Sequence, residues 1–162
     1  MTRYADLATL RKNISPDVSI VDDGRRDDAT TLEANAGALG GSAPLEHDEQ
    51  AALFEWADAA QGEHPELAML FAIPNGGARH PAVAAQLKAE GVKAGVPDVC
   101  LPVARGRFHS LWIEMKRKPN RTSDAQRAWL DALRQHGHCA VVCWSMAEAQ
   151  QTIMAYLGQE VR

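Results

Sequence analysis

The sequence predicts an α/β domain in which a small mixed β-sheet is flanked by helices. Segments with apolar residues at helical spacing alternate with short apolar runs, in the order helix, helix, strand, strand, helix, strand, helix. The chain has 162 residues, 46% of them hydrophobic, which is enough for one domain with a buried core. We find no internal repeat, so a repeat architecture is not expected.

The domain is expected to occupy residues 45–162, because residues 1–44 differ from the rest in composition. This first segment has few large apolar residues and carries the acidic pairs Asp22-Asp23 and Asp27-Asp28. Such a composition favours a loosely ordered N-terminal arm, with room for a short helix at Tyr4–Lys12. Nothing in the arm predicts a role for it.

Two helices are expected in the first half of the domain. Residues 46–61 carry apolar side chains at helical spacing. Pro65–Ile73 is expected to form a turn or helix start that leads into a strand, and residues 74–77 (Pro-Asn-Gly-Gly) a loop. Pro81–Glu90 is the second helix, with proline in its first turn and Gly91 after its end.

The next two strands are expected to form a hairpin. Val99–Val103 and His109–Lys116 are largely apolar, and the segment between them, Ala104–Arg107, contains a glycine suited to a turn. A turn at this point makes the two strands antiparallel neighbours.

A helix, a buried strand and a final helix complete the domain. The helix Ser123–Gln135 begins with a capping residue, either Ser123 or Thr122. Cys139–Trp144 is a continuous apolar run, typical of a buried strand, and Met146–Leu157 has helical spacing.

Composition argues against membrane proteins and disulfide-stabilised proteins. No apolar run approaches the roughly 20 residues of a membrane span, and the N-terminus lacks a signal-peptide core. We therefore expect a protein of the cytoplasm, in a bacterial or phage-infected cell, without membrane contact. The three cysteines, Cys100, Cys139 and Cys143, lack CxxC spacing and are interpreted as buried apolar residues rather than as disulfide partners or zinc ligands.

The charge of the chain is unevenly distributed. The net charge of −4 by itself disfavours a nucleic-acid partner. Residues 1–70, however, hold 5 Lys/Arg against 14 Asp/Glu, whereas residues 71–134 hold 11 against 5. This asymmetry predicts a basic working face on an acidic protein.

Three charged residues of the hairpin are the main candidates for catalysis. Glu114 and Lys116 lie two apart on one strand, so both side chains leave the same face of the sheet, together with Trp112. A turn near Gly106 brings Asp98 back beside Glu114. Two carboxylates and an ammonium group are therefore expected to converge.

Such a cluster suits the cleavage of phosphodiester bonds. Mg²⁺ prefers one or two carboxylates together with water and substrate phosphate, and the carbonyl of Met115 could add a further oxygen. A bound metal ion lowers the pKa of water, and a neighbouring lysine can hold that water and offset phosphate charge. Judged by spacing alone, the alternative is a solvated strand face with a surface ion pair. Two charges within an apolar strand favour the catalytic interpretation.

Basic residues near this cluster are candidates for contact with a phosphate backbone. The Pro-Asn-Gly-Gly loop and the residues after it could form a backbone nest for phosphate or a plain turn. Exposed lysines could contact a duplex or be solvated. The candidate DNA-contacting residues are Asn75, Arg79, Lys93, Arg117, Lys118 and Arg121.

Several ordered motifs resemble those of the VRR-NUC family, within the PD-(D/E)xK nuclease superfamily. The likeness covers roughly residues 45–158 and implies a restriction-endonuclease-like core. The motifs are Glu49-Gln50, the Pro-Asn-Gly-Gly loop, Gly91–Asp98, Ile113–Lys116, Ser123-x-x-Gln126 and Gly137 with the strand after it.

The resemblance also implies roles for individual residues. Asp98 and Glu114 would hold the metal, and Lys116 would be the catalytic lysine. Glu49 would match the helical acid that completes the metal site, although Glu46 lies near the same helix face and competes for this role. Gln126 would border the site and orient water or phosphate.

Together these observations lead us to expect a DNA endonuclease that depends on Mg²⁺, with Mn²⁺ as a substitute. Small stand-alone members of the family look phage-like, are similar to structure-specific or Holliday-junction-resolving nucleases, and are often homodimeric. We expect a homodimer that acts on branched DNA. The alternatives are another repair or restriction-like nuclease of the superfamily, and a catalytically silent nucleic-acid-binding module.

Overall fold

The structure is a computed structural model that describes residues 46–74 and 81–160. The expected N-terminal arm and the loop residues Asn75 and Arg79 lie outside the described residues. Within the described part, no helix is long and apolar enough to cross a membrane.

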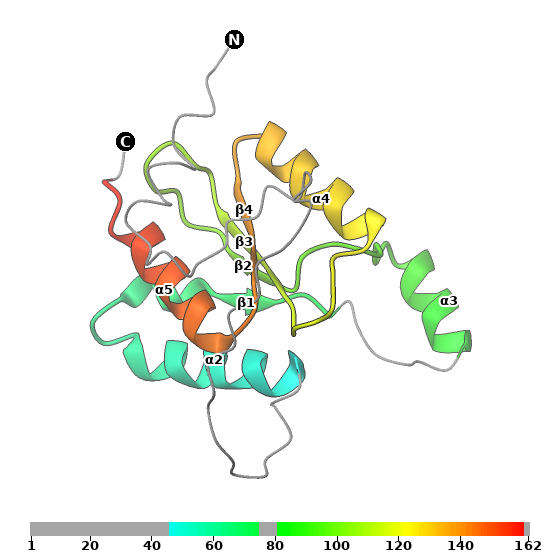
Figure 1. Cartoon of the computed structure of the whole chain (residues 1–162), viewed down its shortest axis with the longest axis horizontal. Helices are drawn as coiled ribbons and strands as arrows, with labels where there is room; N and C mark the ends of the chain where they lie inside the picture. Colours follow the sequence, from blue (N-terminus) through cyan, green and yellow to red (C-terminus); the bar gives the residue numbers. More distant parts are fainter. Residues whose placement is uncertain (1–45, 75–80, 161–162) are drawn as a thin grey trace, which may run out of the picture.

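A four-stranded mixed sheet forms the centre of the domain (Figure 1). The strands β1 (Phe71–Ala72), β2 (Val99–Leu101), β3 (Leu111–Met115) and β4 (Cys139–Cys143) lie side by side in this order. The pairs β1–β2 and β2–β3 are antiparallel, and the pair β3–β4 is parallel. The mixed sheet and the hairpin predicted from the sequence are thus confirmed.

The hairpin strands are shorter than the sequence indicates. The strand β2 ends at Leu101, because the next residue is Pro102, which has no N–H to donate to a neighbouring strand. The partner strand β3 begins at Leu111 instead of His109. Pairing from Val99↔Ile113 to Leu101↔Leu111 keeps the expected alignment around Gly106.

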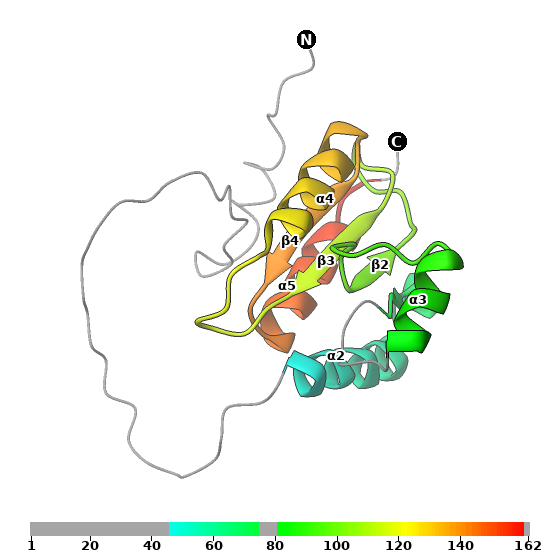
Figure 2. The same cartoon turned by 90° about the vertical axis from the view of Figure 1, so that its right-hand side faces the viewer.

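Helices cover both faces of the sheet (Figures 1 and 2). The helices α2 (Glu46–Ala60) and α5 (Met146–Leu157) lie on one side, and α4 (Asp124–Gln135) lies on the other. The short 3-10 helix η1 (Pro65–Met69) leads into β1, and α3 (Pro81–Ala89) stands at the edge of the molecule. Each helix starts within a residue of its predicted position.

Alternation along β3 and β4 divides the core in two. Ile113 and Met115 join the larger cluster, to which α2 and α5 contribute Leu53 and Ile153. Trp112 packs with the smaller cluster beneath α4. Because side chains alternate along a strand, Glu114 enters the sheet face that α4 covers.

All three cysteines are buried and free, as the sequence predicts. Burial raises the pKa of the Cys100 thiol to about 11 and that of Cys139 to about 12. Burial also raises the pKa of Cys143. The thiols therefore remain protonated and unreactive near neutral pH.

The segment before β2 is packed tightly against the start of α4. Gly95 has a φ of +84°, and a Cβ built there would lie 2.7 Å from the backbone carbon of Ala125. One residue earlier, the carbonyl of Ala94 accepts a hydrogen bond from Nε1 of Trp129 at 3.1 Å. The glycine permits this close approach, which fixes the chain just ahead of Asp98.

Replacing Gly95 by alanine should destabilise the domain more than replacing Gly91. Both glycines have positive φ, so both variants carry the backbone cost of about 1 kcal/mol. A Cβ at Gly91 meets open space, whereas a Cβ at Gly95 meets backbone that must move, at a further cost of roughly 1–3 kcal/mol. Urea denaturation of both variants measures the difference. Equal unfolding free energies would contradict the close packing at Gly95.

Candidate active site

The strand register places the two hairpin carboxylates together. Continuing the β2–β3 pairing one residue beyond Val99↔Ile113 sets Asp98 opposite Glu114. The Oδ2 atom of Asp98 accepts a hydrogen bond from the backbone N–H of Met115 at 2.9 Å. This bond extends the ladder through a side chain and anchors Asp98 at the end of β3.

Glu114 is fully buried, with an exposed fraction of 0%. Its Oε1 atom accepts hydrogen bonds from Nζ of Lys116 at 2.7 Å and from Nε2 of Gln126 at 2.5 Å. Its Oε2 atom is also buried but has no hydrogen-bond partner among the described residues. A buried carboxylate oxygen in this state is costly unless a cation or donor reaches it.

The pKa of Glu114 is raised to about 7, first by burial and then by the charge of the nearby Asp98 carboxylate and by a side-chain hydrogen bond with Asp98, which forms when one of the two carboxyl groups is protonated. The ammonium of Lys116 acts in the opposite direction, both through its hydrogen bond and through its charge. Two carboxylates that share a site resist joint ionisation unless positive charge is added. The site is therefore short of positive charge.

Lys116 directly follows β3, and 9% of its side chain is exposed. Its Nζ atom contacts Oε1 of Glu114 and also the carbonyl oxygen of Met115, at 3.0 Å. Both atoms are oxygens of the expected metal site. The lysine is thus held against these two protein oxygens, with little of its side chain exposed to solvent.

The donor set fits a hard divalent cation. Asp98 and Glu114 supply carboxylate oxygens, and Met115, which directly follows Glu114, supplies a carbonyl oxygen. The unpartnered Oε2 atom of Glu114 is an oxygen that such a cation would satisfy. These residues would hold Mg²⁺ through oxygen atoms alone, which is the ligand type that this ion prefers.

Comparison with known proteins identifies the family of the chain. The family model described as the VRR-NUC domain matches residues 46–147. The chain belongs to the VRR-NUC family. This family is part of the PD-(D/E)xK superfamily, and the domain implies a function of the nuclease type.

A solved structure supports the same assignment. The chain is similar to a protein described as a VRR_NUC domain protein, with 28% sequence identity and a TM-score of 0.62. The similarity covers 75% of this chain and 93% of that one. The mixed sheet flanked by helices is therefore the VRR-NUC fold, as expected from the sequence. No match is found among curated proteins.

Of the acidic residues predicted to hold metal, the structure brings Asp98 and Glu114 together. The Oε2 atom of Glu49 instead accepts a hydrogen bond from the backbone N–H of Met146, at the start of α5, at 2.5 Å. Across residues 46–74 and 81–160, no group of three His, Cys, Asp or Glu side chains is placed to hold a metal ion. A ligand role for Glu49 stays a prediction, and the side chain of the competing Glu46 lies outside the described residues.

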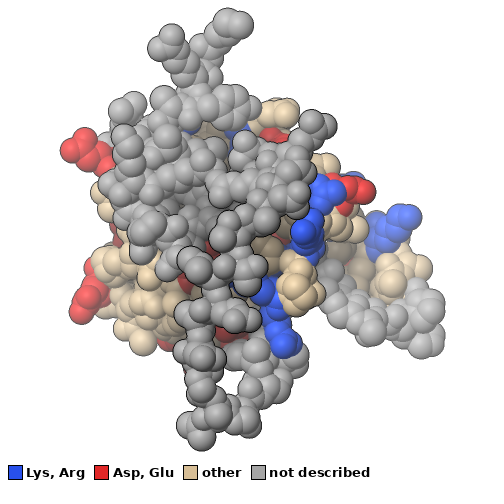
Figure 3. All heavy atoms as spheres, viewed as in Figure 1, with Lys and Arg blue, Asp and Glu red and all other residues tan. Residues whose placement is uncertain are grey.

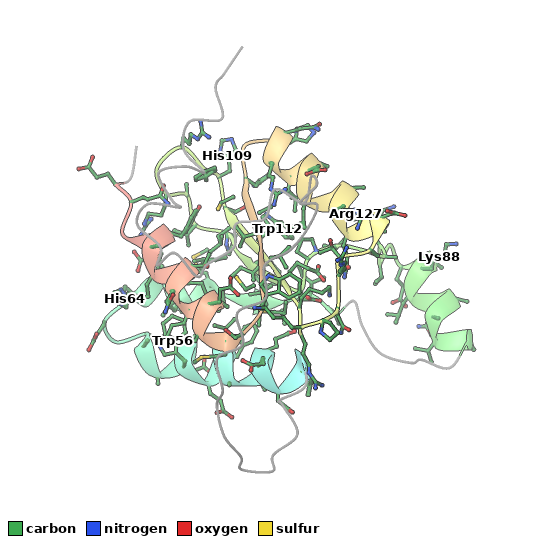
Figure 4. All side chains as sticks on the ribbon, viewed as in Figure 1. Trp56, His64, Lys88, His109, Trp112 and Arg127 are labelled. Carbon is green, nitrogen blue, oxygen red and sulfur yellow. The ribbon has the colours of Figure 1, made fainter. Side chains whose placement is uncertain are left out.

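Gln126 lies in the site, on the first turn of α4, and contacts Glu114. A role of this residue toward water or phosphate stays a prediction. Trp112 shares the sheet face of Glu114, but its indole N–H donates to Oγ of Ser110 at 2.8 Å, toward the other end of β3 (Figure 4). Trp112 is thus a partly buried residue that packs against the cluster beneath α4.

The basic residues near the site in sequence are mostly exposed. Lys93, Lys118 and Arg121 are exposed, and Arg117 is half-buried. Figure 3 shows Lys and Arg side chains on the side of the molecule where α3 and α4 lie. In the chain, Arg117, Lys118 and Arg121 follow Lys116 within five residues, and Lys93 precedes Asp98 by five.

Sequence reasoning missed one residue near the site, Arg127. Its guanidinium donates to the carbonyl of Thr122 at 2.5 Å and forms an ion pair with Asp124 (Figure 4). The arginine thereby ties the segment after Lys116 to the start of α4. The Asp-x-x-Arg spacing, which suits a helical ion pair, was the available signal.

Proposed function

We propose that this VRR-NUC protein is a Mg²⁺-dependent endonuclease that hydrolyses phosphodiester bonds in DNA. The observation that carries the proposal is the fully buried Glu114, held by Lys116 and Gln126 on one oxygen and unpartnered among the described residues on the other. A purely structural glutamate would gain little from burial beside a second carboxylate. For a ligand of a divalent cation, burial strengthens the attraction to the metal, and a neighbouring carboxylate provides a second ligand.

We propose separate roles for the residues of the site. Asp98, Glu114 and the Met115 carbonyl would hold the metal, with Mn²⁺ as a substitute for Mg²⁺. When bound, the metal supplies a Lewis acid that lowers the pKa of water and offsets the charge on the phosphoryl group. Lys116, which contacts Glu114 and the Met115 carbonyl, would hold the attacking water and neutralise phosphate charge. Gln126 fixes the carboxylate of Glu114.

The basic residues around the site support DNA as the substrate. Lys93, Arg117, Lys118 and Arg121, together with Asn75 and Arg79, are proposed to contact the phosphate backbone. Such contacts carry no base information, so we propose that the enzyme reads DNA structure rather than sequence. A branched substrate such as a Holliday junction presents two symmetric strands, and a homodimer would match that symmetry.

A cleavage panel tests this proposal. The purified chain is incubated with a four-way junction, a flap and a linear duplex, each with Mg²⁺, with Mn²⁺ or with a chelator. We expect cutting of the junction that needs the metal and is faster than cutting of the linear duplex. Equal cutting of all three would refute structure specificity. No cutting under any condition would refute the nuclease assignment.

Removing exposed basic residues should weaken DNA binding without changing its structural preference. Lys118→Ala and Arg121→Ala should each reduce the slope of log K against log salt by about 1, because each removes one phosphate contact. Arg107→Ala changes the net charge equally but lies in the turn at the opposite end of β2 and β3. Binding titrations over a range of salt concentrations measure the slopes. Identical slopes for the wild type and both site variants would contradict the assignment of Lys118 and Arg121.

A further inference from the structure

The capping motif of α4 also reaches into the active site. The backbone N–H of Ser123, the N-cap residue, donates to Oε1 of Gln126 at 2.8 Å. In return, Oγ of Ser123 accepts from the backbone N–H of Gln126 at 3.3 Å. These two reciprocal bonds form a capping box. In most helices this motif serves the helix end alone, but here Nε2 of the same Gln126 amide donates to Glu114.

Only one orientation of the Gln126 amide satisfies both neighbours. A glutamine amide can turn over, which exchanges its oxygen and its nitrogen. Turned over, the amide would present N–H to the N–H of Ser123 and oxygen to the carboxylate of Glu114. Both contacts would be repulsive. The Ser123 N–H, which can only donate, therefore selects the orientation in which Gln126 donates to Glu114.

The residue type at this position fits the same role. A capping box accepts either glutamate or glutamine at its third helical position. A glutamate there would accept from Ser123 equally well, but it would place another carboxylate against Glu114 and Asp98 and would have no N–H to donate. Glutamine is the choice that serves both the helix end and the buried carboxylate.

We propose that the backbone N–H of Ser123 is a positioning group for the metal site, acting through Gln126 on Glu114. The proposal rests on the proposed function, since it assigns Glu114 to a metal ion. With Gln126 and Lys116 both on Oε1, the carboxylate is held so that Oε2 stays available to the cation. Groups that orient a metal ligand typically contribute about 10–100-fold to metal affinity or activity.

Two substitutions of Ser123 separate the contribution of its backbone N–H from that of its side chain. Ser123→Pro removes it, and the φ of −73° at Ser123 suits proline. Ser123→Ala removes Oγ but keeps the N–H, so it is the matched control for the loss of the cap. Two readouts are used: Mn²⁺ affinity of the metal-free protein, measured by calorimetry, and NMR signals of the Gln126 side-chain amide.

We expect S123P to lose about 10-fold or more in Mn²⁺ affinity, while S123A stays within about threefold of the wild type. The Gln126 amide signals should move toward solvent-exposed values in S123P and stay in place in S123A. Equal Mn²⁺ affinities of the two variants, with Mn²⁺ binding intact in the wild type, would overturn this inference alone. A wild type without Mn²⁺ affinity would overturn the proposed function and the inference together.

If S123P does not fold, the same hydrogen bond can be tested by NMR in the wild-type protein. A scalar coupling across the hydrogen bond, between the Ser123 nitrogen and the Gln126 side-chain carbonyl carbon, reports the same contact. Its detection in metal-bound protein supports the inference. Its absence there, in spectra that show such couplings for backbone hydrogen bonds of α4, overturns it.

Discussion

Lys116→Met should reduce the rate of DNA cleavage at saturating substrate by about 10²–10³-fold, the usual loss when one preorganised charge at a reacting phosphate or carbonyl is removed. Methionine retains much of the length of the side chain but cannot donate to Glu114 or hold a water molecule. Asp98→Asn should have a similar effect, because it keeps the shape of the side chain and removes the charge that we propose to hold the metal. Single-turnover cleavage of the preferred DNA with Mg²⁺ measures both rates.

A second lysine provides the control for these substitutions. Lys88→Met makes the same replacement at an exposed lysine of α3. At saturating DNA, this variant should cleave DNA at the wild-type rate. Circular dichroism and the thermal midpoint establish that each variant is folded. Cleavage by folded K116M or D98N at the wild-type rate would remove that residue from the catalytic assignment.

The metal-free protein should lose stability as the pH rises from about 4.5 to 7. The pKa of Glu114 is about 7 in the folded state against an ordinary value of 4.5, so the folded state holds a proton that the unfolded state releases. A group with a raised pKa contributes its full stability below the unfolded value and loses it as the pH passes the folded value. The difference of pKa corresponds to roughly 3 kcal/mol across this range.

Urea denaturation between pH 4 and pH 8 tests this dependence, with a chelator present. Glu114→Gln should flatten the profile over this range, whereas Glu63→Gln, at an exposed side chain, should leave it unchanged. Saturating Mg²⁺ should restore stability near pH 7 in the wild type if the proposed metal site is correct, because the metal would bind the ionised carboxylate. A profile of E114Q that matches the wild type would show that Glu114 does not titrate in this range.

Local features of the sequence determined most of the fold and part of the site. The alternation of Ile113, Glu114 and Met115 fixed which side chains face α2 and α5, since successive residues of a strand point to opposite faces. Ser123 and Gly91 marked a helix start and a helix end, because capping depends on nearby backbone groups. The hairpin around Gly106 then sufficed to place Asp98 opposite Glu114.

Contacts between segments that are distant in sequence decided the remaining features of the site. Such contacts depend on how helices pack on the sheet, which no local sequence pattern encodes. The close approach of Gly95 to Ala125, and the donation from Gln126 to Glu114, follow from how α4 lies on the sheet. The engagement of Glu49 with the start of α5 follows from the packing of α2 against α5. The sequence by itself determined that Asp98, Glu114 and Lys116 converge. Only the tertiary structure decided that Glu114 is fully buried with one oxygen held by donors, because burial is set jointly by the elements that close over a side chain.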